Sequence, residues 1–429
     1  MIYQLIYRPE WIAEPVRLPL SKSIAIRVSA LNAVARRQGE GATVVPELSD
    51  CDDARYFNAA IRALEEGRRD IYIGEGGAPL RFFTALAASM PGVEIELTCA
   101  SSLMTRPLKP LLDALDMAGA DIVCTTREGY PPLTIRGHLL RPSGLRLDPS
   151  VSSQFVSALM LASPLWERGL NLEFTEGRPV SAPYIAMTAE VMRRFGAEVG
   201  VSEGGIRVEP GRLSPPKRFE VETDWSAASY FYELALLLPG RDIPLGRLSR
   251  PDNSLQGDSI CSSMFNLFGV RTIWASDGSA TLRCDETILN ELRRMDTPLE
   301  FDLNSTPDLM PAIAVGLCFA GIRFRLTGIR HLRHKESDRL TVIANELEKV
   351  GYRVETGADH MAWTGGRMPT AENEVIATYS DHRIAMAFAP AAVKLPYLAI
   401  ENPGVVEKSF PGYWDALKGL GFEIRRFGS

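Results

Sequence analysis

The feature that most constrains this chain is a recurring pattern: an apolar-periodic stretch ends in a glycine, and a short strand-like run follows. The five clear glycines of this kind are Gly119, Gly196, Gly269, Gly351 and Gly421. They are 77, 73, 82 and 70 residues apart. A glycine in this position is typical of a left-handed cap that closes a helix and leads into a strand.

The spacing of these glycines predicts internal repetition over the whole chain. A weaker sixth glycine, Gly67, precedes the first of them by 52 residues. Six units of about 72 residues would fill the 429 residues. The alternative is that helix, glycine and strand follow one another by chance, as they often do in α/β proteins.

The periodicity within one repeat predicts a mixed α/β class. Apolar residues at 340, 343, 344, 347 and 350 follow the spacing of a helix with one buried face. Residues 70–73 and 94–98 alternate or run apolar, as strands do. The length predicts two or three domains, and the Pro- and Gly-rich residues 209–216 are the best internal boundary.

The charge balance excludes partners that are held by a general basic field. The chain has 53 acidic and 47 basic residues and a net charge of −6, so we expect neither nucleic acid nor an anionic membrane as a partner. The six cysteines are scattered without a C-x-x-C pair, which favours reduced thiols in the cytoplasm. The first residues lack the pattern of a signal peptide, and the longest apolar stretch, 311–322, is too short to span a bilayer. We therefore expect a soluble cytoplasmic protein.

Several basic residues stand where predicted helices begin. They are Lys22, Arg81, Arg106, Lys335, Arg339 and Arg383. A helix N-terminus carries partial positive charge, so a cation there is unfavourable unless an anion binds. The set predicts a small polyanionic ligand held by cations and backbone N–H groups together.

Two acids near these cations are candidates for proton transfer. Asp308 precedes a predicted helix over 309–317, and Glu336 lies inside the basic segment 335–339. Asp308 could equally be a helix cap, and Glu336 could be a structural counter-ion. A carboxylate pair among arginines would also suit addition and elimination on a phosphorylated substrate.

Other chemistries lack their motifs. The segment 74–77 does not have the order of a P-loop, and the zinc motif H-E-x-x-H does not occur. His331 and His334 are the only neighbouring histidines and are better explained as surface or substrate-proximal residues than as metal ligands. No metal site is expected.

The whole motif series resembles the 3-phosphoshikimate 1-carboxyvinyltransferase family, also called 5-enolpyruvylshikimate-3-phosphate (EPSP) synthase. The motifs occur in the order of the family and span nearly the whole chain. They are L-P-L-S-K-S at 18–23 with Arg27, V-S-S-Q-F at 151–155, P-D at 307–308, K-E-S-D-R-L at 335–340, Y-S-D-H-R at 379–383 and K-S-F-P at 408–411.

The resemblance implies a fold of two inside-out α/β barrel-like domains with a cleft between them that closes on substrate. Each domain would hold three βαβαββ-type repeats, six in all, which agrees with the glycine count. One domain would comprise 1–18 and 226–429, and the other 19–225. The chain would cross between domains near Pro19 and near Asp224.

The implied reaction transfers the enolpyruvyl group of phosphoenolpyruvate to the 5-hydroxyl of shikimate 3-phosphate and releases phosphate through a tetrahedral intermediate. It belongs to the shikimate pathway of aromatic amino acid and chorismate biosynthesis. The resemblance implies no cofactor and no metal. It also implies a monomer whose partners are the two small-molecule substrates.

The resemblance also implies roles for individual residues. Asp308 matches the base that takes the 5-hydroxyl proton, Glu336 the group that handles the methylene proton, and Lys22 a catalytic cation that both ligands share. The positions matching shikimate 3-phosphate ligands are Lys22, Ser23, Arg27, Ser152, Ser153, Gln154, Ser181, Tyr184, Asp308, His331 and Lys335. The positions matching phosphoenolpyruvate ligands are Lys22, Gly77, Arg106, Gln154, Arg339, Arg383 and Lys408.

The chain departs from the family pattern at one turn above all. Residues 74–78 read G-E-G-G-A, where the family usually has G-N-A/S-G-T, so an amide and a hydroxyl are lost and the acid Glu75 is gained. Leu20, Ile26 and His331 are smaller departures beside the other motifs. Our hypothesis is that the phosphoenolpyruvate pocket is altered and that glyphosate sensitivity differs from that of typical members.

Two alternatives compete with this interpretation. Enolpyruvyl transfer to UDP-N-acetylglucosamine uses the same architecture, but that family has a cysteine where this chain has Ser101. The other alternative is a non-catalytic protein that binds shikimate 3-phosphate. Loss of Asp308, Glu336 or Lys22 would favour it, and all three are present.

Overall fold

The chain forms two compact units. The computed structural model describes residues 1–10, 14–39, 49–142, 144–175, 177–370 and 374–428. Unit 1 comprises Met1–Pro19 and Glu222–Ser429, and unit 2 comprises Leu20–Val221. The inserted domain expected from the sequence, 19–225, begins one residue earlier and ends four residues later than unit 2.

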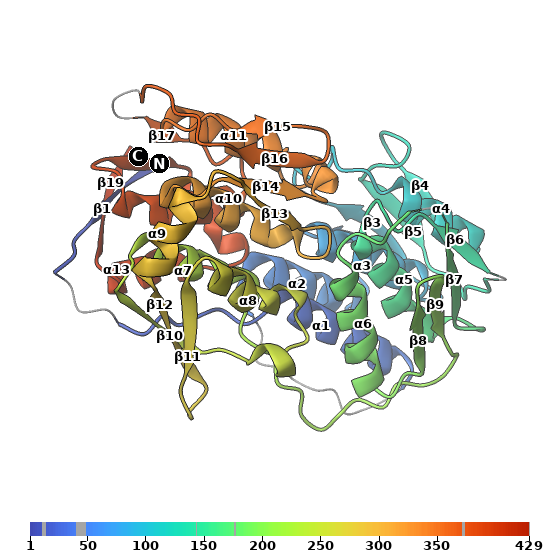
Figure 1. The fold of residues 1–429 in the computed structure, drawn as a ribbon. Helices are drawn as coiled ribbons and strands as arrows, with labels where there is room; N and C mark the ends of the chain where they lie inside the picture. The colour runs from blue at the N-terminus through green and yellow to red at the C-terminus, as the bar shows by residue number, and fades with distance from the viewer. Residues whose placement is uncertain (11–13, 40–48, 143, 176, 371–373, 429) are drawn as a thin grey trace. The chain divides into compact units, whose positions relative to one another are not determined.

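Unit 2 contains two four-stranded sheets and six α-helices within its described residues. The strands are β2 (Asp70–Tyr72), β3 (Glu94–Thr98), β4 (Asp121–Cys124), β5 (Leu133–Arg136), β6 (Leu145–Leu147), β7 (Leu170–Phe174), β8 (Val199–Ser202) and β9 (Gly205–Val208). The α-helices are α1 (Lys22–Arg37), α2 (Asp52–Glu65), α3 (Gly77–Ala88), α4 (Lys109–Met117), α5 (Ser153–Ala162) and α6 (Ala182–Arg194). In Figure 1 the strands β8 and β9 lie beside α6.

Unit 1 contains three sheets and seven α-helices in the part of the chain that the structure describes. The strands are β1 (Ile2–Tyr7), β10 (Asp242–Arg247), β11 (Val270–Trp274), β12 (Ser279–Cys284), β13 (Leu299–Asp302), β14 (Phe324–Thr327), β15 (Glu355–Thr356), β16 (His360–Trp363), β17 (Val375–Ile376), β18 (Leu398–Glu401) and β19 (Phe422–Phe427). The helices are α7 (Trp225–Leu237), α8 (Cys261–Leu267), α9 (Glu286–Arg294), α10 (Met310–Ala320), α11 (Arg339–Lys349), α12 (His382–Phe388) and α13 (Tyr413–Gly419).

Three sheets share one topology, which confirms the internal repetition. Their strand orders are β2-β3-β5-β4, β6-β7-β9-β8 and β13-β14-β16-β15. In each sheet the first two strands are parallel, and the remaining pairs are antiparallel. A helix joins the first strand to the second and another joins the second to the third, so each repeat reads βαβαββ.

Two further sheets complete the same topology with strands from elsewhere in the chain. In the order β17-β18-β1-β19, β1 takes the third place and pairs antiparallel with both neighbours, with Ile2 opposite Phe427 and opposite Glu401. In β10-β12-β11, a parallel bridge from Val16 to Leu245 stands where the first strand would be. Residues near the start of the chain therefore complete two repeats of unit 1.

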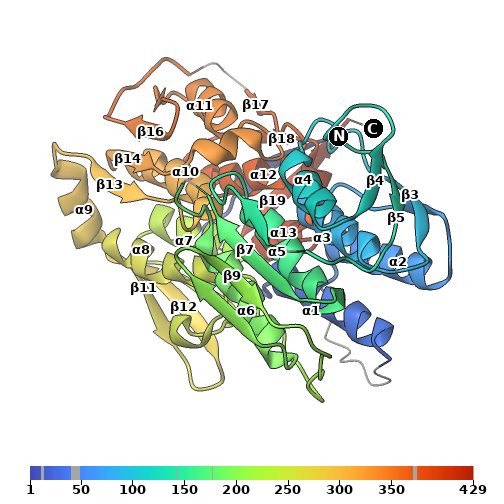
Figure 2. The same ribbon diagram turned by 90° about the vertical axis from the view of Figure 1, so that its right-hand side faces the viewer.

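The first helix of each repeat is buried on nearly every side. These helices are α1, α3 and α5 in unit 2 and α7, α10 and α12 in unit 1. A helix that is apolar all round belongs in a core, and α10 (sequence M-P-A-I-A-V-G-L-C-F-A) is one. Within each unit these helices pack on one another with the sheets outside them, which is an inside-out arrangement (Figure 2).

The glycine pattern is explained by the second helix of each repeat. The glycines that follow α4, α6, α8, α11 and α13 have φ of +92°, +83°, +94°, +91° and +92°. Gly67, after α2, has φ of +73°. These are left-handed caps, as the sequence predicts, and a side chain would be strained at each.

The structure also describes the apolar helices and the cysteines. Among the residues that the structure describes, no helix is both long enough and apolar enough to cross a membrane. All six cysteines are free thiols, and all except Cys124 are buried.

Candidate active site

Two buried helices of unit 1, α10 and α12, and the neighbouring helix α11 bring polar side chains together at their N-terminal ends. Asp308 lies in the short 3-10 turn before α10, and Asp381 is the N-cap of α12. Arg339 is the first residue of α11. Each helix is fixed by the repeat topology, so residues far apart in sequence meet here.

Arg339 is the centre of this group. Its guanidinium donates to three carboxylates: Nε lies 2.8 Å from Asp381 Oδ2, Nη2 lies 2.8 Å from Glu336 Oε2, and Nη1 lies 3.2 Å from Asp308 Oδ1. The residue is 1% exposed. Burial by itself lowers the pKa of Arg339, but Asp381 and Glu336 raise it above its ordinary value. The guanidinium therefore stays charged and its orientation is fixed by its own partners.

Asp308 is held by cations rather than used as a helix cap. Arg383 Nη2 lies 2.8 Å from Asp308 Oδ2, and Arg383 Nη1 also donates to the Asp308 backbone carbonyl at 3.2 Å. Burial would raise the pKa of Asp308, but Arg383, Lys335 and Arg339 together hold it well below its usual range. Asp308 is therefore ionised at neutral pH and can accept a proton.

Glu336 joins a third cation, Lys408, to the same group. Its Oε1 lies 3.3 Å from Lys408 Nζ, while its Oε2 accepts from Arg339. Lys408 is 7% exposed. Arg339, Arg383 and Lys408 are the cations of what we name the arginine cluster, and Asp308, Glu336 and Asp381 are its carboxylates.

Two titratable residues border the arginine cluster. Burial, together with the charge of Asp308, raises the pKa of Asp258 to about 7, and its carboxylate accepts from the Ser226 hydroxyl. Burial and the neighbouring Lys335 lower the pKa of His331 to about 3. His331 is therefore neutral, and its buried Nε2 has no hydrogen-bond partner among the described residues.

In unit 2, Arg27 of α1 is hydrogen-bonded to residues of α5 and α6. Its guanidinium donates to Thr188 Oγ1 at 2.7 Å, Ser157 Oγ at 3.2 Å and the carbonyls of Ser23 and Tyr184 at 2.8 and 3.3 Å. All four acceptors are uncharged. Burial lowers the pKa of Arg27 to about 10, so the side chain remains a cation at neutral pH. A buried positive charge with neutral partners favours a bound anion nearby.

The serine motifs of unit 2 lie at helix starts. Ser152 is the N-cap of α5 and accepts from the Gln154 backbone N–H at 3.2 Å. Ser153 begins that helix. Ser181 is the N-cap of α6 and has the left-handed φ of +53°. A non-glycine residue in that conformation is strained, and such strain is concentrated at functional sites.

The first turn of α3 begins with Gly77 because a larger residue would collide with two arginines. A Cβ at this position would lie 2.5 Å from Arg81 Nη1 and 3.1 Å from both terminal nitrogens of Arg106. Both arginines are buried, and Arg81 Nη1 donates to Gln154 Oε1 at 2.6 Å. The backbone of α3 therefore approaches two guanidinium groups closely, and the turn, Arg81, Arg106 and Gln154 form one cationic group.

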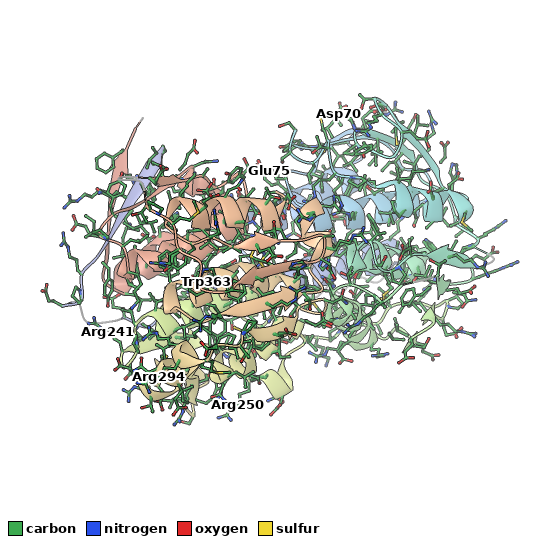
Figure 3. All side chains as sticks on the ribbon, turned by 45° about the horizontal axis from the view of Figure 1, so that its top comes forward. Asp70, Glu75, Arg241, Arg250, Arg294 and Trp363 are labelled. Atoms are coloured by element: carbon green, nitrogen blue, oxygen red, sulfur yellow. The ribbon has the colours of Figure 1, made fainter. Side chains whose placement is uncertain are left out.

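Lys22 has an acidic partner in unit 2. Its Nζ lies 3.0 Å from Asp53 Oδ2, and the side chains of Lys22 and Asp53 are 18% and 6% exposed. Glu75, the acid that replaces an amide in the family pattern, has an exposed side chain; Figure 3 labels it. Glu75 lies two residues before Gly77 on the turn that enters α3.

The structure thus brings some of the predicted residues together within each unit. Asp308, Glu336, Arg339, Arg383 and Lys408 form one group, bordered by His331 and Lys335. In unit 2, Arg27 meets Ser23 and Tyr184, and Gly77 approaches Arg106. Within the described ranges, no set of three or more His, Cys, Asp or Glu side chains is arranged to hold a metal ion.

Sequence reasoning missed two of the acids that hold these cations. Asp381 and Asp53 lie 42 and 31 residues from the cations they pair with, and each follows the local pattern of a helix start. Sequence reasoning also did not assign Asp258 or Arg81 to a ligand. A cation at a helix N-terminus signals that an acid is needed, but the sequence does not say which acid.

Comparisons with known proteins agree on one family. The family model for EPSP synthase (3-phosphoshikimate 1-carboxyvinyltransferase) matches residues 58–417. A 3-phosphoshikimate 1-carboxyvinyltransferase of Bacteroides fragilis is 39% identical over 423 residues, which is 98% of each chain. The enzyme of the same name from Pasteurella multocida is 33% identical and covers 94% of each chain.

Solved structures share the fold. An EPSP synthase from Acinetobacter baumannii has a TM-score of 0.74 at 21% identity and covers 100% of both chains. The enolpyruvyl transferase NikO from Streptomyces tendae has a TM-score of 0.73 at 16% identity and covers 99% of this chain and 98% of its own. The inside-out α/β fold of the chain is that of these structures.

Proposed function

The chain belongs to the EPSP synthase (3-phosphoshikimate 1-carboxyvinyltransferase) family, and from this premise we infer that its two groups of cations and carboxylates carry the reaction of that family. The chain is an enzyme that transfers the enolpyruvyl group of phosphoenolpyruvate to the 5-hydroxyl of shikimate 3-phosphate. The products are 5-enolpyruvylshikimate 3-phosphate and phosphate.

The arginine cluster supports a role in binding phosphoenolpyruvate. Arg339, Arg383 and Lys408 are nearly buried and meet at two carboxylates, Asp308 and Glu336. Three desolvated cations suit a ligand that carries a carboxylate and a phosphate, because charge-assisted hydrogen bonds are stronger out of water. We assign Arg339, Arg383 and Lys408 to phosphoenolpyruvate, with Lys22, Gly77, Arg106 and Gln154 of unit 2 as its further ligands.

Asp308 is the proposed base. The 5-hydroxyl oxygen of shikimate 3-phosphate attacks C2 of phosphoenolpyruvate, and its proton passes to Asp308 while C3 takes a proton from the Glu336 carboxyl group. A tetrahedral intermediate results. Loss of a proton from C3 then expels phosphate and restores the double bond, and we assign this methylene proton to Glu336. When the phosphoenolpyruvate carboxylate takes contacts from Arg339 and Arg383, the pKa of Asp308 rises towards its ordinary value, which makes it a stronger base.

The residues near Arg27 support binding of the sugar-like phosphate ester. We assign Lys22, Ser23, Arg27, Ser152, Ser153, Gln154, Ser181, Tyr184, Asp308, His331 and Lys335 to shikimate 3-phosphate. Hydroxyl groups at the starts of α5 and α6 can bond hydroxyls or phosphate oxygens, and Arg27 donates to Ser157 of α5 and to the Tyr184 carbonyl of α6. His331 is neutral with a buried Nε2 that lacks a partner among the described residues, which suits a ligand hydroxyl.

We also propose that the enzyme works without a cofactor, as a monomer in the cytoplasm. Proton transfer and charge stabilisation are all that the chemistry requires, and the side chains above can supply both. Size-exclusion chromatography with light scattering tests the monomer directly. A dimer at the working concentration would contradict it.

The fold alone does not choose the acceptor, since NikO has the same fold and a different name. The acceptor is supported by the family match and by the buried cation Arg27, whose four hydrogen-bond acceptors are uncharged and which therefore suits the phosphate of shikimate 3-phosphate. The test is phosphate release from phosphoenolpyruvate, with shikimate 3-phosphate and UDP-N-acetylglucosamine compared as acceptors. Release only with shikimate 3-phosphate is expected. Release with the nucleotide sugar instead would overturn the assignment.

A further inference from the structure

The segment that carries Asp381 has a conformation that needs support from outside itself. Tyr379 and Ser380 have φ of +52° and +56°, so two consecutive non-glycine residues are left-handed. Such conformations persist only where surrounding contacts impose them. Asp381 follows immediately and turns back into an extended conformation with φ of −109°.

The support comes from Glu346, a residue that the reaction itself does not use. Its side chain is 0% exposed and lies in α11. Tyr379 donates its hydroxyl proton to Glu346 Oε1 at 2.7 Å, and the Ala377 backbone N–H donates to Glu346 Oε2 at 3.1 Å. Lys349 Nζ, 2.7 Å from Oε2, compensates the charge and also donates to the carbonyl of Val375 at 3.1 Å.

The same helix binds the segment at a second point. Arg339 is seven residues before Glu346, about two helical turns. Its guanidinium donates two hydrogen bonds, of 2.8 and 3.3 Å, to the Asp381 carboxylate. The left-handed pair lies between these two points. Glu346 holds the entry to the turn, and Arg339 holds its exit.

Asp381 connects the supported turn to two proposed ligand-binding cations, Arg339 and Arg383. Its Oδ2 accepts from Ser337 Oγ at 3.1 Å as well as from Arg339, and its Oδ1 accepts from the Arg383 backbone N–H at 3.0 Å. Asp381 therefore fixes the guanidinium plane of Arg339 and the first turn of α12 that carries Arg383. A shift of Asp381 would move both arginines together.

We propose that Glu346 and Tyr379 are positioning residues for phosphoenolpyruvate: they hold the left-handed turn 379–380 and thereby set the orientation of Arg339 and Arg383. The inference rests on the proposed function of these arginines. Neither positioning residue is assigned a contact with the substrate. Tyr379 is 43% exposed and its contribution lies in its hydroxyl, which reaches a buried carboxylate.

The test is a comparison of Tyr379→Phe and Glu346→Gln with Glu348→Gln, an exposed glutamate on the same helix. For Tyr379→Phe we expect KM for phosphoenolpyruvate to rise about fivefold, because one hydrogen bond to a charged group is lost. Glu346→Gln should raise it further, and KM for shikimate 3-phosphate should change less than about twofold. The double variant should be little worse than Glu346→Gln, because the two residues act through one contact.

The outcomes separate a positioning role from a structural one. Equal changes in both KM values, or a lower melting temperature with unchanged kinetics, would overturn the inference. Tyr379→Phe removes one oxygen only, so it keeps the test valid if Glu346→Gln fails to fold. If the wild type has no turnover with these substrates, the proposed function fails instead. Calorimetric Kd values for phosphoenolpyruvate then decide the inference, which falls if the variants bind as the wild type does.

Discussion

At the residue scale, the candidate site depends on how one arginine is shared. Arg339 contacts Asp308, Glu336 and Asp381 through its three guanidinium nitrogens. Lysine has one nitrogen and cannot reproduce this planar arrangement. The guanidinium therefore determines where the proposed base, the proposed methylene-proton residue and the cap of α12 lie relative to one another.

Glu75 gives a prediction about specificity. Its exposed carboxylate lies on the turn before Gly77, where family members usually have an amide. Removing a negative charge beside an anion site should favour anions, so Glu75→Asn should lower both KM for phosphoenolpyruvate and the inhibition constant of glyphosate by a few fold. The matched control is Asp70→Asn, another exposed acid of unit 2 that Figure 3 labels.

Steady-state kinetics with glyphosate titration measures both quantities. The hypothesis of an altered pocket is contradicted if the wild type already responds to glyphosate as typical members do. It is also contradicted if the asparagine variant is indistinguishable from the wild type.

The proposed ligand-binding residues were more predictable than the residues that hold them. Lys22, Arg339 and Arg383 could be singled out because cations oppose the dipole at a helix start. Their partners could not, since Asp53 and Asp381 follow the ordinary preference for acids at helix starts. Asp308 had two explanations on spacing. Thr306 and Leu309 are the caps of the 3-10 turn and of α10, and Asp308 instead contacts Arg339 and Arg383.

At the element scale, the glycine caps should be worth measurable stability. Gly119 has φ of +92°, and an added Cβ would meet nothing within 4 Å, so Gly119→Ala changes only the backbone preference. We expect a loss of about 1 kcal/mol in the free energy of unfolding. Gly211→Ala is the control, because Gly211 also has open space and is not left-handed.

Urea unfolding of the two variants measures the difference. Gly211→Ala should be neutral or slightly stabilising, since alanine restricts the unfolded chain. Equal effects of the two substitutions would contradict the assignment of left-handed caps to the repeat.

The packing of α7 against α10 contains a buried acid that predicts a pH effect. Glu233 is 0% exposed, neither carboxylate oxygen has a hydrogen-bond partner among the described residues, and burial raises its pKa well above the ordinary value. A Cβ at Gly316 of α10 would lie 3.0 Å from Glu233 Cγ. Glu233→Leu should therefore raise the free energy of unfolding by about 1–3 kcal/mol.

The gain should grow with pH. Above about pH 4.3 the unfolded chain releases the Glu233 proton while the folded chain keeps it, so the wild type loses stability as the pH rises towards the folded pKa. Urea unfolding at pH 5 and pH 8 should show that Glu233→Leu raises the free energy of unfolding over the wild type by more at pH 8 than at pH 5. The difference between Glu233→Gln and the wild type should change with pH in the same direction. A gain that is equal at both pH values would contradict a neutral Glu233.

Periodicity predicted elements better than it predicted their burial. The helix 340–350 and the strands at 70–73 and 94–98 match α11, β2 and β3 to within one residue at each end. The same periodicity does not reveal that the first helix of each repeat is buried on nearly every side. That property depends on sheets formed by distant strands, and it was implied only by the family resemblance.

At the scale of the whole molecule, β1 shows that the repeats are joined in a permuted order. It occupies the third place in the sheet β17-β18-β1-β19 and pairs with β19 from Ile2 opposite Phe427 to Tyr7 opposite Phe422. In the other repeats the corresponding pair is a contiguous hairpin, such as β8 and β9. The first strand therefore stands in for a strand that would otherwise adjoin β19 in the sequence.

This topology predicts that β1 can be moved but not removed. A permuted chain that starts at Pro9 and carries residues 2–8 after β19 through a short linker should fold and retain kcat within a few fold. Deletion of residues 1–8 leaves β18 and β19 without their shared neighbour, and it should give insoluble or unfolded protein. Circular dichroism and activity compare the two. A folded deletion variant, or an unfolded permuted chain, would contradict the role of β1.

The most direct test of the proposed reaction is identification of the product by mass spectrometry from phosphoenolpyruvate and shikimate 3-phosphate, with wild type and Asp308→Asn side by side. We predict 5-enolpyruvylshikimate 3-phosphate and an equal amount of phosphate from the wild type. Asp308→Asn should still bind shikimate 3-phosphate but turn over about 10²- to 10⁴-fold more slowly, as loss of a general base requires. Full activity in Asp308→Asn would contradict the role of Asp308, and no enolpyruvyl product from the wild type would contradict the reaction itself.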